Sequence, residues 1–367
     1  MGTHLPFRGS AFPHGEVMAN VQKQFEQFDE AIKLRRYHEN ATLAEKREKV
    51  LKSLSEGIAR QRKEGAEIPP YRNFNQGSYD VGTGVKPLDG DYDIDVGVEF
   101  DLAKDKHTPV EVKKWVLNAV EDHTSEVKMR RSCVTVYYMQ GGEPQYHVDL
   151  AVYSKAARNP DGKMYLARGK EHSSKENQEW TPSAPEELTD KINNRFDKES
   201  EARQFRQAIR ALKRWKDHRF QSEGQAAPRG IALAVAALSW FSPMTSEVEG
   251  EQKPDNLTAL VRFVQALLRQ FSPAKDDHGE PYSRIKIVCP VEPFDDLCAR
   301  MTAEQMRQFH ARVETLLEAL EEAQKDADPH TACKTLQVEF GDDFPVPPKK
   351  DTGSPRRPAI TSSGNSG

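Results

Sequence analysis

The stretch that decides how this chain folds is GSYDVGTGVKPLDGDYDIDVGVEF, residues 77–100. From Asp91 to Phe100, polar or small residues alternate with apolar ones at every position. Because successive side chains of a β-strand point to opposite faces, this period of two predicts a strand. One face is apolar and belongs in a core, and the other presents Asp91, Asp93 and Asp95.

The acidic face of this strand predicts a site for a divalent cation. Carboxylates a few ångströms apart cannot all stay ionised unless a positive charge compensates them. Mg²⁺ prefers hard oxygen ligands and is commonly held by a few carboxylates together with substrate phosphates. Asp93 and Asp95 would project side by side, and Asp149, in the segment HVDL of residues 147–150, would supply a third carboxylate from a neighbouring strand. The alternative is a solvated strand edge that binds no metal.

A glycine and a serine lie upstream of the acids, at Gly77 and Ser78. Glycine lets a backbone approach a phosphate closely, and a serine hydroxyl together with free amides at a turn can hold a triphosphate. A Gly-Ser pair alone is weak evidence. The order Gly-Ser, spacer, Asp-x-Asp and distant Asp is more specific, and it indicates a nucleotide site.

The flanking sequence predicts an α/β half followed by a mainly helical half. Upstream, we expect a helix over residues 21–32 and a second one that begins at a capping box, Thr42 to Glu45, and ends near Gly65. Downstream, the predicted elements are a helix over 110–120, strands over 132–139 and 146–153 joined at a Gly-Gly turn, a polar surface excursion over 154–182, and helices over 205–215, 231–241, 257–271 and 302–326. The basic residues of the excursion could steer nucleotides or bind an activating polymer, although a solvated loop is the simpler interpretation.

Composition excludes several classes of protein. The chain has 367 residues with 53 Lys and Arg against 57 Asp and Glu, a net charge of -4, so we expect no constitutive nucleic-acid binding. No apolar run approaches the roughly 20 residues that span a bilayer. The four cysteines are far apart and form no CxxC pair, which predicts reduced thiols and a cytoplasmic protein.

Residues 77–98 resemble the active-site signature of the polymerase β-type nucleotidyltransferases. Among these they are most similar to the bacterial CD-NTases, relatives of cyclic GMP-AMP synthase that make cyclic oligonucleotide signals in the CBASS form of anti-phage defence. The similarity extends to HVD at 147–149, to ALKRWK at 211–216 and to the segment from Ala332 to Asp342, and covers most of residues 60–345.

The resemblance implies an α+β fold with a polymerase β-like nucleotidyltransferase lobe, a mixed sheet with helices, and a mainly α-helical C-terminal lobe. The expected division is a flexible N-terminus over 1–15, a nucleotidyltransferase core with N-terminal helices over 16–185, a helical lobe over 186–346 and a disordered tail over 347–367.

The resemblance also assigns roles to individual residues. By position, the paired metal ligands are Asp93 and Asp95, the third catalytic and metal-binding acid is Asp149, the phosphate-binding turn is Gly77 and Ser78, and the lysine directed at the triphosphate is Lys213. Asp91 permits a second Asp-x-Asp register, but the later pair runs straight into apolar strand, as in the family. Lys213 has a plain alternative as one of several basic residues on a solvated helix face.

One position departs from the family pattern. Arg229 stands where the family has a small hydroxyl residue, so no nucleotide contact is carried over to it.

The activity implied by the resemblance is condensation of NTPs, including ATP, into a cyclic di- or trinucleotide with release of pyrophosphate. Two Mg²⁺ ions, or Mn²⁺, would serve as cofactors. The alternatives are a template-independent RNA nucleotidyltransferase of the same superfamily and a non-catalytic nucleotide-binding module.

The partners implied by the resemblance are the NTP substrates and a downstream cyclic-nucleotide effector, and the protein is expected to be a monomer. In some operons of the family, a ubiquitin-transfer-like partner joins the C-terminal glycine to a target. Gly367 is the residue that would be joined here.

Overall fold

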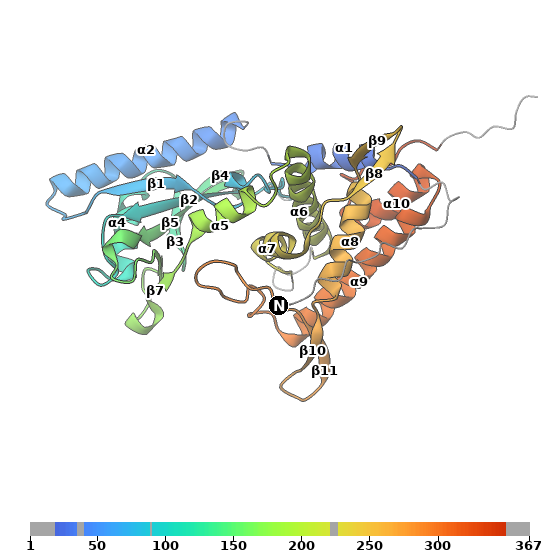
Figure 1. Ribbon diagram of the computed structural model, residues 1–367. Coiled ribbons are helices and arrows are strands. Elements are labelled where there is room, and N and C mark those ends of the chain that lie inside the picture. Colours follow the sequence, from blue (N-terminus) through green and yellow to red (C-terminus); the bar gives the residue numbers. More distant parts are fainter. Residues whose placement is uncertain (1–18, 35–39, 89, 221–226, 350–367) are drawn as a thin grey trace, which may run out of the picture.

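The computed structural model describes residues 19–34, 40–88, 90–220 and 227–349. The predicted flexible N-terminus lies outside these residues, as does the predicted tail from residue 350 onward, including Gly367. Two halves lie side by side, one built around a sheet and the other from helices (Figure 1).

The first half is a mixed sheet whose strands follow the order β1-β2-β5-β4-β3. Its strands are β1 (Tyr71–Asn75), β2 (Tyr92–Phe100), β3 (Glu126–Met129), β4 (Val134–Gln140), β5 (Glu143–Ser154), β6 (Tyr165–Arg168) and β7 (Glu179–Pro182). The central pair, β2 and β5, is parallel, and every other pairing is antiparallel. The helices of this half are α2 (Ala41–Lys63), α3 (Gly77–Asp80), α4 (Pro109–Val120) and α5 (Pro185–Asn193).

The alternation in β2 buries one face of the sheet, as the sequence predicts. Ile94, Val96 and Val98 are fully buried in a core that also contains apolar residues of α2 and α4. The opposite face of β2 and β5 carries the acids and is therefore free to face the second half of the molecule.

The second half is a set of helices around α6. Its helices are α1 (Gln22–Ile32), α6 (Glu199–Arg219), α7 (Gly230–Trp240), α8 (Asn256–Leu268), α9 (Ala303–Lys325) and α10 (Pro329–Phe340), and its hairpins are β8 (Thr245–Val248) with β9 (Glu251–Pro254) and β10 (Ser272–Lys275) with β11 (Pro281–Arg284). Trp215 of α6 is fully buried in their common core.

The structure corrects two of the local predictions. The segment 154–182 is not only a surface excursion, because β6 and β7 pair with β5 and extend the sheet. The second helix begins two residues earlier than predicted: Asn40, not Thr42, is the N-cap, and its side chain accepts a hydrogen bond from the Leu43 amide at 3.3 Å.

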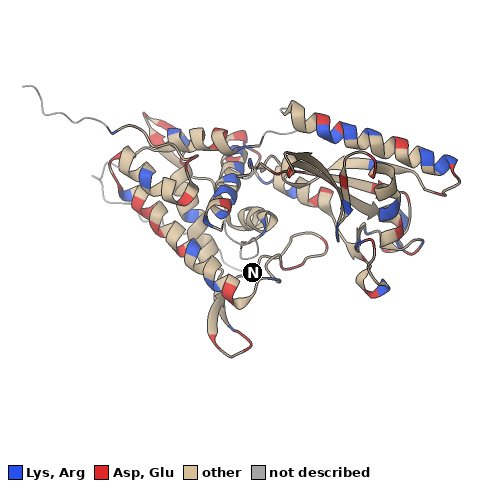
Figure 2. Cartoon of the chain, turned by 180° about the vertical axis from the view of Figure 1, so that it is seen from behind, with Lys and Arg blue, Asp and Glu red and all other residues tan. Residues whose placement is uncertain are grey.

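Acidic and basic residues are interspersed over both halves (Figure 2). All four cysteines are buried and free. In the part of the chain that the structure describes, no helix combines the length and apolarity needed to cross a membrane.

Candidate active site

The parallel pairing of β2 with β5 brings the predicted acids together. In this register Asp95 lies opposite Asp149, and Asp93 lies opposite His147. Potential ligand atoms of Asp93, His147 and Asp149 all lie within 4.8 Å of one another. Residues separated by more than 50 positions in the chain thus form one polar cluster on the face of the sheet.

His147 is a member of this cluster to which the sequence analysis assigned no role. Its Nδ1 lies 2.8 Å from Oδ1 of Asp91, and its Nε2 lies 3.1 Å from Oδ1 of Asp93. Burial opposes protonation of the ring, but the hydrogen bonds of Asp93 and Asp91 and the charges of Asp93 and Asp149 outweigh it and raise the pKa of His147 to about 9. The imidazolium therefore offsets part of the negative charge of the acids.

Burial and neighbouring carboxylates disfavour the ionised forms of the two deeper acids, Asp95 and Asp149. Burial raises the pKa of Asp95 well above its ordinary value, and the charges of Asp93 and Asp149 raise it further. Burial and the charge of Asp93 also raise the pKa of Asp149. Three carboxylates in this arrangement are a hard-oxygen donor set, and a divalent cation would stabilise their ionised forms. The cluster therefore fits a divalent metal.

Thr135 of β4 is a second residue that the sequence analysis missed. It is fully buried, and its Oγ1 donates a hydrogen bond to Oδ1 of Asp149 at 2.5 Å. The antiparallel register places the two residues opposite each other. The available signal was weak: Thr135 stands between Val134 and Val136, so alternation puts it on the same face of the sheet as the acids.

We expect Thr135→Val to lower turnover by roughly 10- to 100-fold, since loss of a partner that orients a metal-binding group has effects of this size. Valine keeps the shape of the side chain but removes the hydroxyl that donates to Asp149. Pyrophosphate release at saturating NTP measures the effect, and Thr135→Ser, which retains the hydroxyl, is the control. Wild-type turnover in the valine variant would show that the hydroxyl does not orient Asp149.

The predicted phosphate-binding turn lies directly against the acids. Gly77 opens α3 with a φ of +75°, a backbone conformation that favours glycine. A Cβ atom on Gly77 would lie 2.0 Å from Oδ2 of Asp95. Ser78 follows in the same turn, and its carbonyl accepts a hydrogen bond from the Thr83 amide at 2.9 Å. The close approach explains why glycine precedes the serine.

Lys213 lies on the side of α6 that faces this turn. It is 8% exposed, and its Nζ donates to the carbonyl of Thr83 at 3.0 Å and to Oγ1 of Thr83 at 3.4 Å. Burial lowers the pKa of Lys213 to about 8, and Lys216 acts in the same direction. The alternative of a solvated helix face is therefore wrong for this residue, while its contact with a triphosphate stays a prediction.

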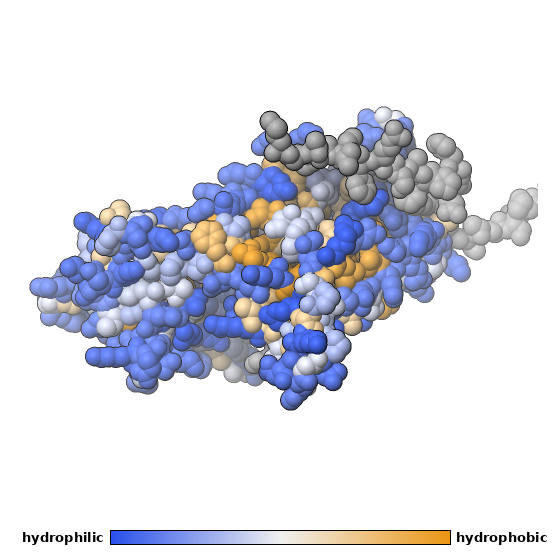
Figure 3. All heavy atoms as spheres, turned by 60° about the horizontal axis from the view of Figure 1, so that its bottom comes forward, coloured by the Kyte–Doolittle hydropathy of each residue, from blue (hydrophilic) through white to orange (hydrophobic). Residues whose placement is uncertain are grey.

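One cleft of about 810 Å³ contains these groups. Five of the six predicted site residues line it: Gly77, Ser78, Asp93, Asp95 and Lys213. Asp149 lies beside Asp95 in the sheet below. Figure 3 shows apolar surface gathered at the centre of this face, between hydrophilic ends. The apolar lining comes from residues such as Ile231, Ala234 and Leu188.

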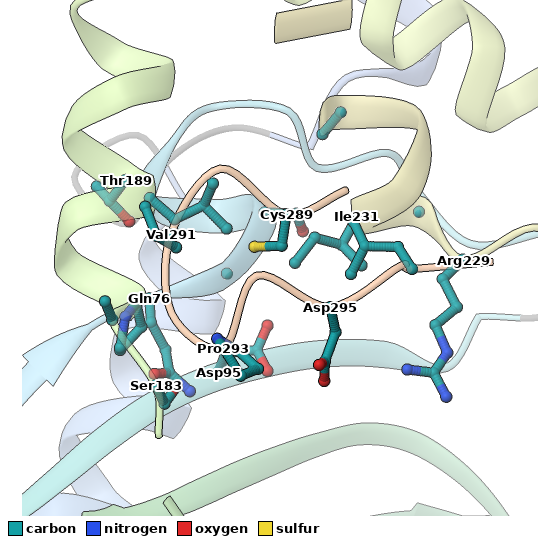
Figure 4. A pocket seen from close by; sticks show the side chains of 18 of the residues that line it. Gln76, Asp95, Ser183, Thr189, Arg229, Ile231, Cys289, Val291, Pro293 and Asp295 are labelled. Atoms are coloured by element: carbon teal, nitrogen blue, oxygen red, sulfur yellow. The ribbon is translucent and has the colours of Figure 1, made fainter. Parts of the chain in front are cut away.

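A loop of the helical half, which the sequence analysis did not single out, forms another wall of the cleft. Cys289, Val291, Pro293 and Asp295 follow one another along it and line the cleft together with Asp95 (Figure 4). The loop contacts the sheet half through an ion pair between Glu292 and Lys163 at 2.5 Å. The cleft is thus closed on one side by residues that are distant in the sequence.

Arg229 also lines this cleft, next to Ile231 at the start of α7 (Figure 4). The position that departs from the family pattern is therefore part of the site.

A comparison with known protein families gives a match in the sheet half. Residues 71–153 match the family model described as cyclic GMP-AMP synthase DncV-like, nucleotidyltransferase domain. This segment, which contains β1 through β5 and all three acids, is therefore similar to the nucleotidyltransferase domain of the DncV-like family.

Over most of its length the chain has the fold of the bacterial CD-NTases, as the sequence resemblance implied, and the predicted fold class is confirmed. CdnC from E. coli MS115-1, solved with ATP, has a TM-score of 0.61 at 17% identity, with 91% of this chain and 100% of that chain covered. CdnG from Bradyrhizobium diazoefficiens, in complex with GTP, gives 0.60 at 16% identity over 89% and 97% of the two chains. DncV from Vibrio cholerae, bound to 3'-deoxy ATP, gives 0.61 at 15% over 89% and 96%.

Proposed function

We propose that this protein is a cyclic oligonucleotide synthase that condenses NTPs, including ATP, into a cyclic di- or trinucleotide and releases pyrophosphate. The observation that carries the proposal is the contact between the Gly77 turn and Asp95, within a cleft that both halves of the molecule line. A triphosphate held at the turn would lie beside the acids. The ATP and GTP complexes of the structural neighbours support NTPs as substrates.

Asp93, Asp95 and Asp149 would hold the divalent metal, for which we propose Mg²⁺. When bound, the metal supplies Lewis acidity, which lowers the pKa of an attacking hydroxyl and neutralises charge on the leaving pyrophosphate. Each of the three carboxylates belongs to β2 or β5, so the sheet fixes their spacing.

The remaining groups position the substrate. Ser78 and the backbone at Gly77 would bind the triphosphate, and Lys213 would exchange its bond to Thr83 for a phosphate oxygen. Thr135 holds Asp149 in place. Apolar residues around Ile231 would exclude water from the base and strengthen these polar contacts.

The test is incubation of the purified protein with each labelled NTP and with all four, in Mg²⁺ or Mn²⁺, followed by phosphatase treatment and mass spectrometry. We expect a phosphatase-resistant product that is absent from the Asp93→Ala/Asp95→Ala variant. Extension of a labelled RNA primer without a resistant product would instead identify an RNA-tailing enzyme. Nucleotide binding with no product under any condition would identify a non-catalytic binding module.

The partners follow from this function. A cyclic product requires a downstream effector that binds it, and we propose that the synthase acts as a cytoplasmic monomer. Conjugation of Gly367 by a ubiquitin-transfer-like partner stays a prediction. Intact mass of the protein after co-expression with the partner genes would test it, and absence of an adduct on Gly367 would contradict it.

A further inference from the structure

Helix α6 holds the segment that follows the phosphate-binding turn. Four of its basic side chains donate to four backbone carbonyls of residues 81–86: Arg206 Nε to Val81 at 3.2 Å, Arg210 Nη1 to Gly82 at 2.5 Å, Lys213 Nζ to Thr83 at 3.0 Å, and Arg214 Nη2 to Lys86 at 2.9 Å. Positions 206, 210, 213 and 214 lie on one side of a helix, so the donors contact the segment in the order of its sequence.

Arg210 and Arg214 are themselves anchored by acids. Arg210 forms a buried bidentate pair with Asp29 of α1, at 2.7 Å and 2.9 Å, and both side chains are 8% exposed. Arg214 lies 3.2 Å from Oδ2 of Asp343, beyond the end of α10. A planar guanidinium can bind a carboxylate and still donate to a carbonyl, which a lysine does less well. These arginines therefore have fixed positions from which to hold the segment.

The held segment determines where Ser78 lies. The amides of Gly82 and Thr83 donate back to the carbonyls of Tyr79 and Ser78, at 3.2 Å and 2.9 Å. The carbonyls of these same two residues, Gly82 and Thr83, accept hydrogen bonds from α6. A shift of α6 would consequently be transmitted through two hydrogen bonds to the turn that lies against Asp95.

Lys213 differs from the three arginines in this row. It lines the cleft together with Ser78 and Asp95, whereas Arg206, Arg210 and Arg214 are not among the cleft-lining residues. Only the lysine can therefore turn toward a ligand in the cleft, and its compact ammonium has one principal bond to give up, the bond to the Thr83 carbonyl.

We propose that Arg206, Arg210 and Arg214 are positioning residues, which keep segment 81–86 and hence the Ser78 turn in place while Lys213 leaves Thr83 to bind the triphosphate. This inference rests on the proposed function of the turn as the NTP site. It assigns the geometry of the phosphate site to the helical half, although the turn itself belongs to the nucleotidyltransferase domain.

Arg206→Gln tests the proposal, because Arg206 is the most exposed of the three and its loss leaves the buried pairs intact. We expect the KM for ATP to rise roughly five- to tenfold, the effect of losing the charge-assisted hydrogen bond to the Val81 carbonyl, with kcat at saturation little changed. Arg206→Lys keeps a donor for Val81 and should restore the KM. Arg203→Gln, at an exposed position of the same helix, is the matched control and should behave as wild type.

Hydrogen exchange provides a readout that does not depend on turnover. In Arg206→Gln the amides of Gly82 and Thr83 should exchange faster than in wild type and in Arg203→Gln, with an unchanged melting temperature. Unchanged exchange and unchanged KM would overturn the inference. If the wild-type protein makes no product, the proposed synthase activity fails, and the affinity for a non-hydrolysable ATP analogue is measured in place of the KM. Weaker binding and faster exchange in Arg206→Gln would then still support the positioning role. Unchanged binding and unchanged exchange would overturn it.

Discussion

Asp95→Asn is expected to lower pyrophosphate release from NTPs by roughly 1,000-fold or more, because the acid is a proposed ligand of the metal that carries the chemistry. Asparagine has nearly the same shape, so it tests charge and ligation without leaving a cavity. The carboxylate of Asp95 also lies so close to Gly77 that no Cβ atom would fit between them. Asp95 would therefore connect the metal site with the triphosphate site.

The same substitution should leave the fold intact. Burial raises the pKa of Asp95 well above its ordinary value, with Asp93 and Asp149 adding to the effect, so the ionised carboxylate destabilises the metal-free folded state. Removing that charge should leave the melting temperature in EDTA at neutral pH unchanged or higher. A lower melting temperature would mean that lost turnover reflects unfolding, and the interpretation of Asp95 as a metal ligand would then lose its support.

Asp91→Asn is the matched control, and it distinguishes the two possible Asp-x-Asp registers. Asp91 lies beside His147, at the end of the cluster away from Asp149. We expect this variant to retain at least about 100-fold more activity than Asp95→Asn. Equal inactivation of the two would favour the earlier register, with Asp91 and Asp93 as the metal pair.

The sequence was sufficient to predict the local part of the site. Alternation from residue 91 to residue 100 depends only on which face of a strand each side chain occupies, so β2 and its buried and acidic faces could be predicted without knowing the fold. Gly77 and Ser78 could be predicted as a phosphate-binding turn from their order relative to the acids, whereas the close contact of the turn with Asp95 was found only in the structure.

The tertiary part of the site could not be predicted in this way. Which strand lies beside β2, and in which register, depends on contacts between distant segments, so the role of His147 beside Asp93 was not visible. Thr135 was missed for the same reason. The strands β6 and β7 are each too short for a period to be recognised.

The partners of the basic residues on α6 also could not be predicted from the sequence. A basic helix usually presents its charges to water, and nothing local distinguishes Arg210 or Arg214 from such residues. Their partners are the acids Asp29 and Asp343 and the backbone carbonyls of a segment more than 100 residues away. Every residue has a backbone carbonyl, so the sequence does not indicate which carbonyls are bound. These contacts can be found only from the structure.

Gly77→Ala is expected to lower turnover by roughly 100-fold or more and to destabilise the fold by at least about 1–2 kcal/mol, the cost of a positive φ for a residue with a Cβ. The added Cβ would lie 2.0 Å from Oδ2, 2.7 Å from Cγ and 2.9 Å from Cβ of Asp95. Rotation of the aspartate can move its oxygen but not its own Cβ, which is fixed to a central strand. The turn must therefore shift away from the acids.

Gly65→Ala separates backbone strain from this clash. Gly65 has a φ of +99°, and a Cβ there would meet nothing within 4 Å. Its alanine variant should lose a similar strain energy, measured by denaturant unfolding, while pyrophosphate release stays at the wild-type rate. Turnover preserved in both variants would show that the turn and Asp95 need not be in contact. Loss of turnover in Gly77→Ala alone would place the turn and the acid in one site. Both variants introduce a Cβ atom at a positive φ, but only the Cβ atom at residue 77 would clash with the carboxylate of Asp95.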